Sequence, residues 1–436
     1  MRAEEQVDVV VIGAGISGLA VTHYLRARGI STVTLDATDR PGGVIESRCV
    51  EGRVLEYGPQ RLRLSEPVET LVDDLSIAHR VTYAQEGLPL YILRDRELHE
   101  VPRTLGTFLS TDLLSTRGKA RVLAELFTRR GDPSESAGGL LRRKFGEEAY
   151  RNLIEPLLGG IYASDPDTMP AGHAIGPLFS LEERDRRLIL TALKHLWKSH
   201  ETSPIISFDE GLAVLPRAIY QEHREAIHLE STVTGISRTS DGEYLVSGDD
   251  IDLRASHVVV TTPAWVAAEL LETVHGVSKP HHLDALHYNP LAIVHLDASH
   301  GQSGMGYQIR RDEGTDTLGV TWNDVLFDRD GVHTAFLGGA WDPSVVDADP
   351  AALGEKAREE FEQTMGVSAR VLDATIIDRA IPAYDRSWND LHRVSLPDRL
   401  WLCTNYTGRI GVPGRLRHAN RVANAIERDL DDGKRL

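Results

Sequence analysis

The opening of the chain constrains its fold more than any other part of the sequence. Residues Val7–Ile12 form a short, nearly continuous apolar run, which is typical of a strand buried on both faces. A glycine-rich loop, Gly13-Ala14-Gly15-Ile16-Ser17-Gly18, follows directly, and the apolar rhythm after it predicts a helix that ends near Gly29. A second strand is predicted at Ser31–Leu35, closed by Asp36. A strand, glycine loop, helix, strand and acid in this order predict a dinucleotide-binding unit rather than a structural turn.

Each glycine of the loop has a distinct role in such a unit. Gly13 permits a tight turn, Gly15 allows the backbone to approach a pyrophosphate, and Gly18 allows the helix to pack closely on the strand. The helix N-terminus then offers unpaired N–H groups and the positive end of its dipole to the phosphates. Asp36 is placed to accept hydrogen bonds from ribose hydroxyls and to repel a 2′-phosphate.

Composition and charge exclude several other classes of protein. The chain has 436 residues, of which 41% are hydrophobic and 26% charged, and this balance suits two or three globular domains. A net charge of −17 argues against nucleic acid as a partner. Two cysteines cannot build a disulfide scaffold or a cysteine-based metal site. The spacing of His281, His282 and His287 fits no common ligand pattern, so no metal is expected.

The sequence also predicts a cytoplasmic protein. No apolar run reaches the roughly 18 residues of a membrane-spanning helix, and the N-terminal residues predict no secretory signal. The segment from Pro102 to Arg130 mixes apolar residues with arginine and lysine. It is predicted either as an amphipathic helix pair packed on its neighbours or as a peripheral contact with the inner face of a membrane, and the first alternative is favoured.

The residues after Asp36 indicate which dinucleotide binds. The chain continues Asp39-Arg40-Pro41-Gly42-Gly43. An acid at a strand end followed by Arg-x-Gly-Gly resembles the extended fingerprint of flavoproteins of the glutathione-reductase and amine-oxidase group. The resemblance implies FAD as the cofactor, with the glycine pair making a second close approach to its pyrophosphate. A basic residue usually follows the two glycines in that group, whereas Val44 stands here, so one phosphate contact is expected to be lost.

Two longer segments, Ser134–Glu148 and Leu153–Asp167, resemble the protoporphyrinogen/coproporphyrinogen oxidase family. Shorter matches follow in consistent order along nearly the whole chain, at Leu55–Pro59, Phe208–Pro216, Val258–Pro263, Leu337–Gly339 and Ile381–Tyr384. The resemblance implies an oxidase of haem biosynthesis that removes hydride equivalents from a porphyrinogen, with FAD as cofactor and dioxygen as acceptor. It also implies that flavin N5 performs the chemistry, so that no catalytic side chain is certain.

The same resemblance implies a three-part α/β fold, α+β overall. It comprises a Rossmann-type FAD-binding domain of the p-hydroxybenzoate hydroxylase/amine oxidase type, a substrate domain with a mixed sheet, and a helical domain over the substrate channel. The predicted ranges are 1–75, 205–280 and 395–436 for the FAD domain, 76–100 and 281–394 for the substrate domain, and 101–204 for the helical domain. Within the substrate domain, residues Pro350–Met365 are predicted as one clear helix.

The resemblance also assigns site residues one by one. The ADP half of FAD is expected at Gly13 to Gly18, Asp36 and Ala37, with the adenine at the backbone of Val233. The isoalloxazine ring is expected beside Gly58, Pro59, Gln60 and Arg61, with Ile410, Gly411 and Val412 on its pyrimidine side. Gly160 is expected to line the substrate channel. From their chemistry alone, Arg61 and Arg63 are interpreted either as anchors for substrate carboxylates or as members of surface ion pairs.

Departures from the family pattern keep other functions open. Ile376-Ile377 stands where Arg-Trp is usual, Ser164 replaces a glycine, and the Gly-His that commonly follows the Pro-x-Tyr segment is absent. Arg409 replaces a glycine and could stabilise the reduced flavin, bind a substrate propionate or point at solvent. The alternative function is a diverged flavin oxidase or desaturase acting on an amine, a polyene or another small molecule. A non-enzymatic escort protein with a decayed nucleotide site is disfavoured by the intact glycines. The oligomeric state is left open.

Overall fold

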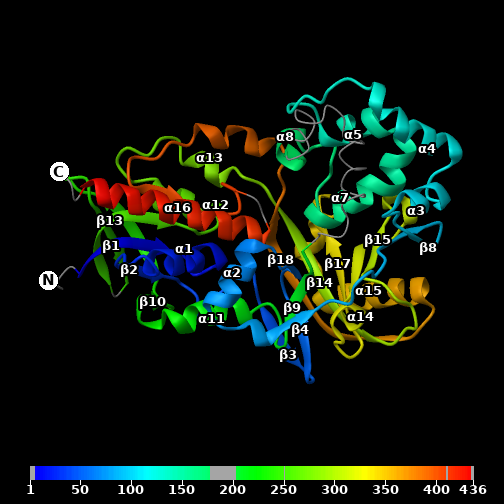
Figure 1. The fold of residues 1–436 in the computed structure, drawn as a ribbon, viewed down its shortest axis with the longest axis horizontal. Helices are drawn as coiled ribbons and strands as arrows, with labels where there is room; N and C mark the ends of the chain where they lie inside the picture. The colour runs from blue at the N-terminus through cyan, green and yellow to red at the C-terminus, as the bar shows by residue number, and fades with distance from the viewer. Residues whose placement is uncertain (1–4, 177–202, 250, 409–410, 434–436) are drawn as a thin grey trace.

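Two large sheets, at opposite ends of an elongated molecule, organise the chain (Figure 1). The computed structural model describes residues 5–176, 203–249, 251–408 and 411–433. The first sheet is mainly parallel and the second is mixed, and a group of short helices covers part of the second. Among the described residues, no helix combines the length and the apolar character that crossing a membrane requires.

The first sheet is built around the predicted opening strand. Its parallel strands include those on either side of β1, and an antiparallel hairpin extends it at one edge. In spatial order the strands are β10 (Ile227–His228), β2 (Thr32–Leu35), β1 (Glu5–Ile12), β13 (Asp252–Val260), β12 (Tyr244–Gly248) and β11 (Val233–Arg238), with β19 (Leu400–Leu402) parallel to the second half of β13.

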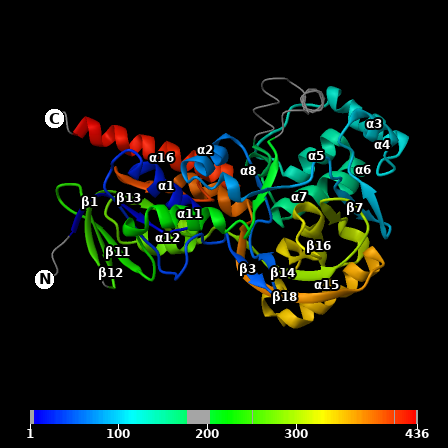
Figure 2. The same ribbon diagram turned by 60° about the horizontal axis from the view of Figure 1, so that its bottom comes forward.

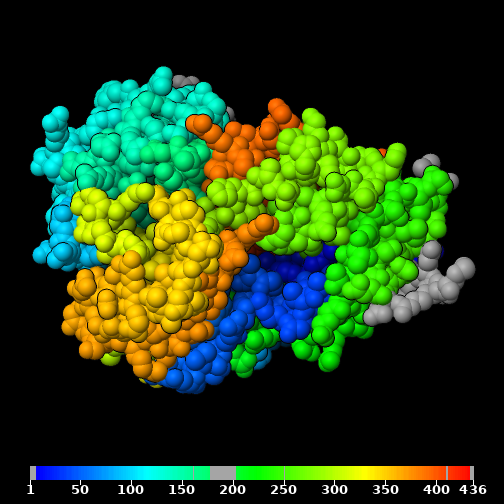
Figure 3. Space-filling model, turned by 180° about the vertical axis from the view of Figure 1, so that it is seen from behind, coloured from blue at the N-terminus to red at the C-terminus, as the bar shows by residue number. Residues whose placement is uncertain are grey.

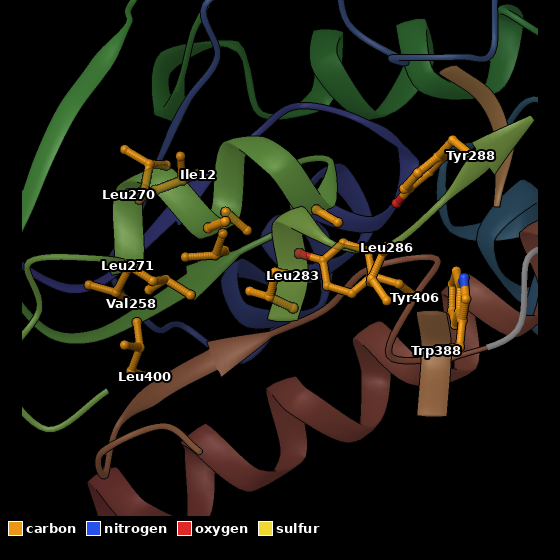
Figure 4. Packing of buried hydrophobic residues seen from close by; sticks show 14 of the residues in the cluster. Ile12, Val258, Leu270, Leu271, Leu283, Leu286, Tyr288, Trp388, Leu400 and Tyr406 are labelled. Atoms are coloured by element: carbon orange, nitrogen blue, oxygen red, sulfur yellow. The ribbon is translucent and has the colours of Figure 1, made fainter. Parts of the chain in front are cut away.

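Helices cover both faces of the first sheet, which explains the continuous apolar run of β1. Val9 and Val11 are buried in one core with α1 (Ile16–Arg26), α2 (Glu66–Asp74), α11 (Val214–Glu222) and α16 (Val412–Gly433). Val10 and Ile12 are buried on the other face against α12 (Ala264–Leu271) and α13 (His281–Asp284), and Figure 4 shows this second core. Alternate side chains of a strand point to opposite faces, so a strand between two helical layers must be apolar at nearly every position.

The second sheet is antiparallel except where β15 and β7 pair in parallel. Its spatial order is β18 (Ala369–Pro382), β14 (Tyr288–Ala298), β17 (Val332–Gly338), β16 (Thr317–Trp322), β15 (Gly306–Ile309), β7 (Tyr91–Arg94) and β8 (Glu97–Glu100). Helix α15 (Pro350–Met365) packs on one face and has the predicted bounds. Asp349 caps its N-terminus by accepting a hydrogen bond from the Ala351 N–H, and Gly366 ends it in a left-handed conformation.

Short helices lie over the other end of the second sheet, as Figures 2 and 3 show from two further sides. They are α3 (Leu105–Ser110), α4 (Thr116–Leu123), α5 (Ala137–Phe145), α6 (Glu147–Ala149), α7 (Glu155–Tyr162) and α8 (Ala171–Ala174), while α14 (Asn323–Phe327) follows β16. Two small sheets, β3 (Ser47–Val50) with β4 (Arg53–Glu56), and β5 (Leu62–Arg63) with β9 (Ile205–Phe208) and β6 (Val81–Tyr83), complete the fold.

The strands of each large sheet come from separated stretches of sequence. The first sheet draws on residues 5–35, 227–260 and 400–402, and the second on residues 91–100 and 288–382. The α/β fold class with a Rossmann-type unit is thus confirmed. The exact domain boundaries stay a prediction. Strand β9 pairs with β5 and β6 and does not join the first sheet.

Candidate functional site

The N-terminus of α1 forms an open cradle at the end of β1. The helix begins at Ile16 without a side-chain cap and without an acidic residue in its first turn. A Cβ atom built on Gly15 meets no protein atom within 4 Å, so space lies directly over this helix end. Unpaired N–H groups beside open space, with no acidic residue in the first turn of the helix, suit a phosphate.

Gly13 and Gly18 are required for a different reason, which is close packing. A Cβ atom on either glycine would lie 2.7 Å from the Thr261 hydroxyl oxygen, and one on Gly18 would also overlap the Gly13 carbonyl oxygen. Gly13 has a φ of 106°, a conformation that side chains rarely adopt. Thr261 donates hydrogen bonds to the carbonyl oxygens of Ile12 at 2.9 Å and Gly13 at 3.0 Å, and so holds the turn against the end of β13.

The second glycine pair lies against the first. The Gly42 N–H donates a hydrogen bond to the Ala14 carbonyl oxygen at 2.8 Å, and Gly15 and Gly42 form an isolated parallel bridge. A Cβ atom on Gly43 would lie 3.3 Å from the Gly15 Cα atom. Both members of the pair have positive φ, 114° and 59°. The two loops predicted to approach a pyrophosphate therefore lie directly against each other.

Asp36 lies at the end of β2, beside the two glycine loops. Its carboxylate accepts hydrogen bonds from the Ala14 N–H at 2.5 Å and from the N–H of Thr38 at 2.8 Å. Its backbone carbonyl oxygen accepts a hydrogen bond from the Ser231 N–H at 2.8 Å, which brings the start of β11, with the half-buried Val233, to the same end of the sheet. Ala37 is exposed beside it. The residues predicted for the adenosine half are thus neighbours in space.

The predicted flavin-side loop continues from the glycine cradle towards the second sheet. A Cβ atom on Gly58 would overlap the Val44 carbonyl oxygen, so this loop packs directly on the segment that follows Gly43. Gln60 is buried, and its amide oxygen accepts a hydrogen bond from the Asn323 side chain at 2.9 Å. Asn323, at the start of α14, also donates to the Thr334 hydroxyl at 3.0 Å. Gln60 therefore joins the loop to the second sheet.

Asn323→Ala is expected to loosen this junction. The change leaves the amide oxygen of buried Gln60 without its donor, which costs about 1–3 kcal/mol of the free energy of unfolding. Thermal unfolding should show the loss, and the visible spectrum of bound flavin should shift because the loop beside it is no longer anchored. The exposed Asn420→Ala is the matched control. Unchanged stability and spectrum in Asn323→Ala would contradict this role for Asn323.

A buried ion pair anchors the start of the same loop. The Glu56 carboxylate lies 2.9 Å from the Arg329 guanidinium, with side chains only 1% and 6% exposed. It also accepts hydrogen bonds from the Ser47 hydroxyl at 2.5 Å and the Leu212 N–H at 3.0 Å. Burial raises the pKa of Glu56, and Arg329 and these donors oppose that effect. Glu56 comes two residues before Gly58, so the pair fixes where the loop begins.

Aromatic side chains gather beside the segment that precedes α16, and Figure 4 labels three of them, Tyr288, Trp388 and Tyr406. The hydroxyls of Tyr288 and Tyr384 donate to the side chain and the backbone of Asn405 at 3.5 and 3.3 Å. Burial raises the pKa of each tyrosine in this group, so the phenols are neutral donors. They hold the chain that leads to the last predicted flavin contacts.

Of those last contacts, the structure describes two. Val412 begins α16 and is buried in the core that also holds Ile16, and Gly411 precedes it. Both therefore lie near the start of α1. Ile410 and Arg409 lie outside the described residues, and the role of Arg409 stays a prediction.

Arg63 lies in β5 and Arg61 directly precedes this strand, and Leu62 between them is buried in the core around α1 and α16. Arg61 is half-buried, and Arg63 is exposed and donates to the Ser203 carbonyl oxygen at 3.0 Å. Burial lowers the pKa of Arg61, and the positive charges of Arg63 and Arg103 lower it further. Among the described residues, no carboxylate is ion-paired with either of the two. The alternative of a surface ion pair therefore finds no partner among the described residues, and the anchor role of both arginines stays a prediction.

Gly160 lies apart from the glycine cradle. It lines a pocket of about 180 Å³ between α7 and the ends of β15, β16 and β17, together with Glu155, Arg311 and Trp341. A Cβ atom on Gly160 would overlap the Gln308 amide, and one on Gly159 would lie 2.7 Å from the Trp341 ring. No cradle glycine is among the residues that line this pocket, so the described geometry leaves a substrate role for Gly160 a prediction.

The segment predicted as an amphipathic pair keeps large apolar side chains on the surface. Leu105, Leu109, Leu123 and Phe127 are exposed, and Phe127 is 88% exposed. The segment does form the expected helices α3 and α4. A peripheral membrane contact through it stays a prediction.

Three residues of the site have no counterpart in the sequence prediction. Thr261, Asn323 and Arg103 each act on a partner far away in the sequence. For Thr261 a signal was present, because the Val258–Pro263 segment matches the family pattern. Asn323 and Arg103 stand in segments without a motif.

Comparison with known proteins adds independent observations. A family model described as flavin containing amine oxidoreductase matches residues 16–426. The chain is 28% identical over 422 residues to protoporphyrinogen oxidase 1, chloroplastic, from Spinacia oleracea, across 86% of this chain and 75% of that protein. It is 27% identical over 395 residues to coproporphyrinogen III oxidase from Bacillus subtilis (strain 168), across 83% of each protein.

A solved structure shares the whole fold. The crystal structure of a candidate protoporphyrinogen oxidase from Exiguobacterium sp. 255-15 has a TM-score of 0.80 to this chain, at 23% identity, and covers 98% of this chain and 99% of that one. With the family match, this likeness confirms the predicted Rossmann-type fold of the amine oxidase kind.

Proposed function

Because the chain belongs to the family of flavin-containing amine oxidoreductases, we propose that it removes hydride equivalents from a porphyrinogen in haem biosynthesis. The chain is an FAD-dependent oxidoreductase. The proposed substrates are coproporphyrinogen III and protoporphyrinogen IX, and the proposed electron acceptor is dioxygen. The names of the relatives from spinach and Bacillus subtilis support the substrate class.

The observation that carries the cofactor part of this proposal is the open space over Gly15. The two glycine pairs and the uncapped start of α1 would hold the diphosphate, and Asp36 would hold the ribose. Gly58 to Gln60 and Gly411 to Val412 would lie beside the ring. FAD supplies, when bound, an acceptor for hydride from a substrate carbon and passes the electrons to dioxygen, which leaves as hydrogen peroxide.

The side chains of the site bind and orient rather than exchange protons. The phenols of the aromatic group are neutral, as their raised pKa values require. Burial lowers the pKa of His295 to about 4, and this histidine hydrogen-bonds the Glu56 carbonyl oxygen at 3.0 Å. These tyrosines and His295 are neutral and already hydrogen-bonded, so their role is to position the loops that carry the predicted flavin contacts. Arg61 and Arg63 would anchor substrate carboxylates.

Anaerobic mixing tests the proposal directly. Purified holoenzyme mixed with coproporphyrinogen III or protoporphyrinogen IX without oxygen should lose its flavin absorbance, and admission of air should restore it with release of hydrogen peroxide. Porphyrin fluorescence should appear once air is admitted, because a porphyrinogen reaches its porphyrin through three two-electron oxidations and the flavin must be reoxidised between them. Flavin that keeps its absorbance with both compounds would exclude this substrate class.

The alternative is a flavin oxidase or desaturase that acts on an amine, a polyene or another small molecule. The family description includes amines, and Ile376-Ile377 in place of Arg-Trp favours a diverged site. Ammonia release from amines, without porphyrin formation, would support this alternative. A colourless protein that cannot be reconstituted with FAD would instead indicate a binding module.

A further inference from the structure

Three arginines form an unneutralised cationic cluster next to the proposed flavin-side loop: Arg61, Arg63 and Arg103. Arg61 follows Gln60 directly, and Arg63 is two residues further, in β5. Arg103 comes from the segment between β8 and α3, about 40 residues away in the sequence. Burial lowers the pKa of Arg61 and of Arg103, and the positive charge of Arg63 lowers both further, as does the charge of Arg103 for Arg61.

Packing explains why these segments meet. Arg63 stands opposite Ile205 in the β5–β9 ladder. Ile205 and Met305 both pack on the small core of Leu88, Leu326 and Phe327. Arg103 reaches the same place, since its guanidinium lies 3.9 Å from the Met305 sulfur atom. Arg63 and Arg103 are therefore held near each other, because the residues they contact, Ile205 and Met305, pack on the same small core.

Within the described part of the chain, the cluster has no acidic partner. Among the described residues, Arg61, Arg63 and Arg103 form no ion pair, and the hydrogen bonds of the Arg63 and Arg103 guanidinium groups go to a carbonyl oxygen and a thioether. Burial lowers the pKa of Arg103 and the negative charge of Glu100 opposes that effect, but the two side chains form no ion pair. The chain carries 65 acidic residues against 48 basic ones, so three neighbouring arginines without a carboxylate partner are unusual for this protein. A half-buried cation such as Arg61 is stable when an anion joins it.

We propose that Arg61, Arg63 and Arg103 bind carboxylates of the substrate together and make the enzyme prefer a tetracarboxylate porphyrinogen over a dicarboxylate one. This inference rests on the proposed function. Guanidinium forks match carboxylates with two parallel hydrogen bonds. Protoporphyrinogen IX carries two carboxylates and coproporphyrinogen III carries four. Three unpaired cations outnumber the two carboxylates of protoporphyrinogen IX. Only coproporphyrinogen III has enough carboxylates to pair with all three.

Equilibrium binding of the oxidised products, coproporphyrin III and protoporphyrin IX, to the holoenzyme tests the inference without turnover. The wild-type protein should bind coproporphyrin III tighter by about tenfold or more, the effect of one further charge-assisted hydrogen bond. Arg103→Gln should bring the ratio of the two dissociation constants close to one, and Arg63→Gln should reduce it. Arg103→Lys should retain part of the preference, since it keeps the charge but loses the fork.

Arg224→Gln, an exposed site with the same change of net charge, is the matched control and should leave the ratio unchanged. Equal binding of both porphyrins by the wild-type protein would overturn the inference, as would an Arg103→Gln ratio no different from that of Arg224→Gln. If the proposed function itself is wrong, a different result is expected: neither porphyrinogen reduces the flavin. Raised salt should lower the affinity for coproporphyrin III more than that for protoporphyrin IX.

Discussion

Gly15→Leu is expected to give a folded protein that no longer retains flavin. The new side chain meets no protein atom near its Cβ, and the φ of −66° at this position suits any residue, so the packing of α1 is unchanged. The side chain enters the space where the diphosphate must approach the helix N-terminus. The flavin content of the purified protein should therefore fall to about a tenth or less, which corresponds to an affinity loss on the order of a hundredfold.

Gly301→Leu is the matched control for this prediction. A Cβ atom at Gly301 also meets no protein atom within 4 Å, and the residue lies in the loop between β14 and β15, outside the first sheet. Absorbance at the flavin maximum measures cofactor content, and thermal unfolding of both apoproteins measures the fold. Full flavin content in Gly15→Leu would contradict the placement of the diphosphate. Gly18→Leu should differ from both variants by failing to fold, because its Cβ overlaps the Gly13 carbonyl oxygen.

Arg329→Ala is expected to have the largest effect on stability among the variants discussed that still fold. It leaves the Glu56 carboxylate buried with its hydrogen bonds to Ser47 and Leu212 but without its counter-charge. Removal of one partner from a buried ion pair costs about 3–5 kcal/mol of the free energy of unfolding. Denaturant titration of the apoprotein should show this loss. Arg26→Ala, which breaks the more exposed pair with Glu225, should cost about 1 kcal/mol or less.

The loss in Arg329→Ala should grow as the pH rises. The folded-state pKa of Glu56 is raised above its ordinary value of 4.5, and removal of Arg329 raises it further. Between the unfolded and the folded pKa, the folded state binds more protons, so an increase in pH favours unfolding. The stability gap to the wild-type protein should widen as the pH rises above the folded-state pKa of Glu56 in the wild-type protein, because below that pKa Glu56 is protonated in both folded proteins. In the Glu56→Gln background, the stability difference caused by Arg329→Ala should not depend on pH. A pH-independent gap in the single variant would contradict the buried charge.

The sequence by itself determined the opening nucleotide-binding unit, the fold class and the helix at Pro350–Met365. These features depend on local signals. The apolar spacing sets the period of each element, and Asp349 and Gly366 mark the two helix ends. The positive φ values of Gly13, Gly42 and Gly43 likewise follow from residue type. Such signals can be read without knowing which segments meet.

Only the tertiary structure decided which distant residues complete the site. Thr261 holds the Gly13 turn, Asn323 anchors Gln60, and Arg103 joins Arg61 and Arg63. Each partner comes from another part of the sequence, and its position depends on strand register and on the packing of apolar cores. Those arrangements minimise exposed apolar surface over the whole chain, so no local pattern of residues encodes them.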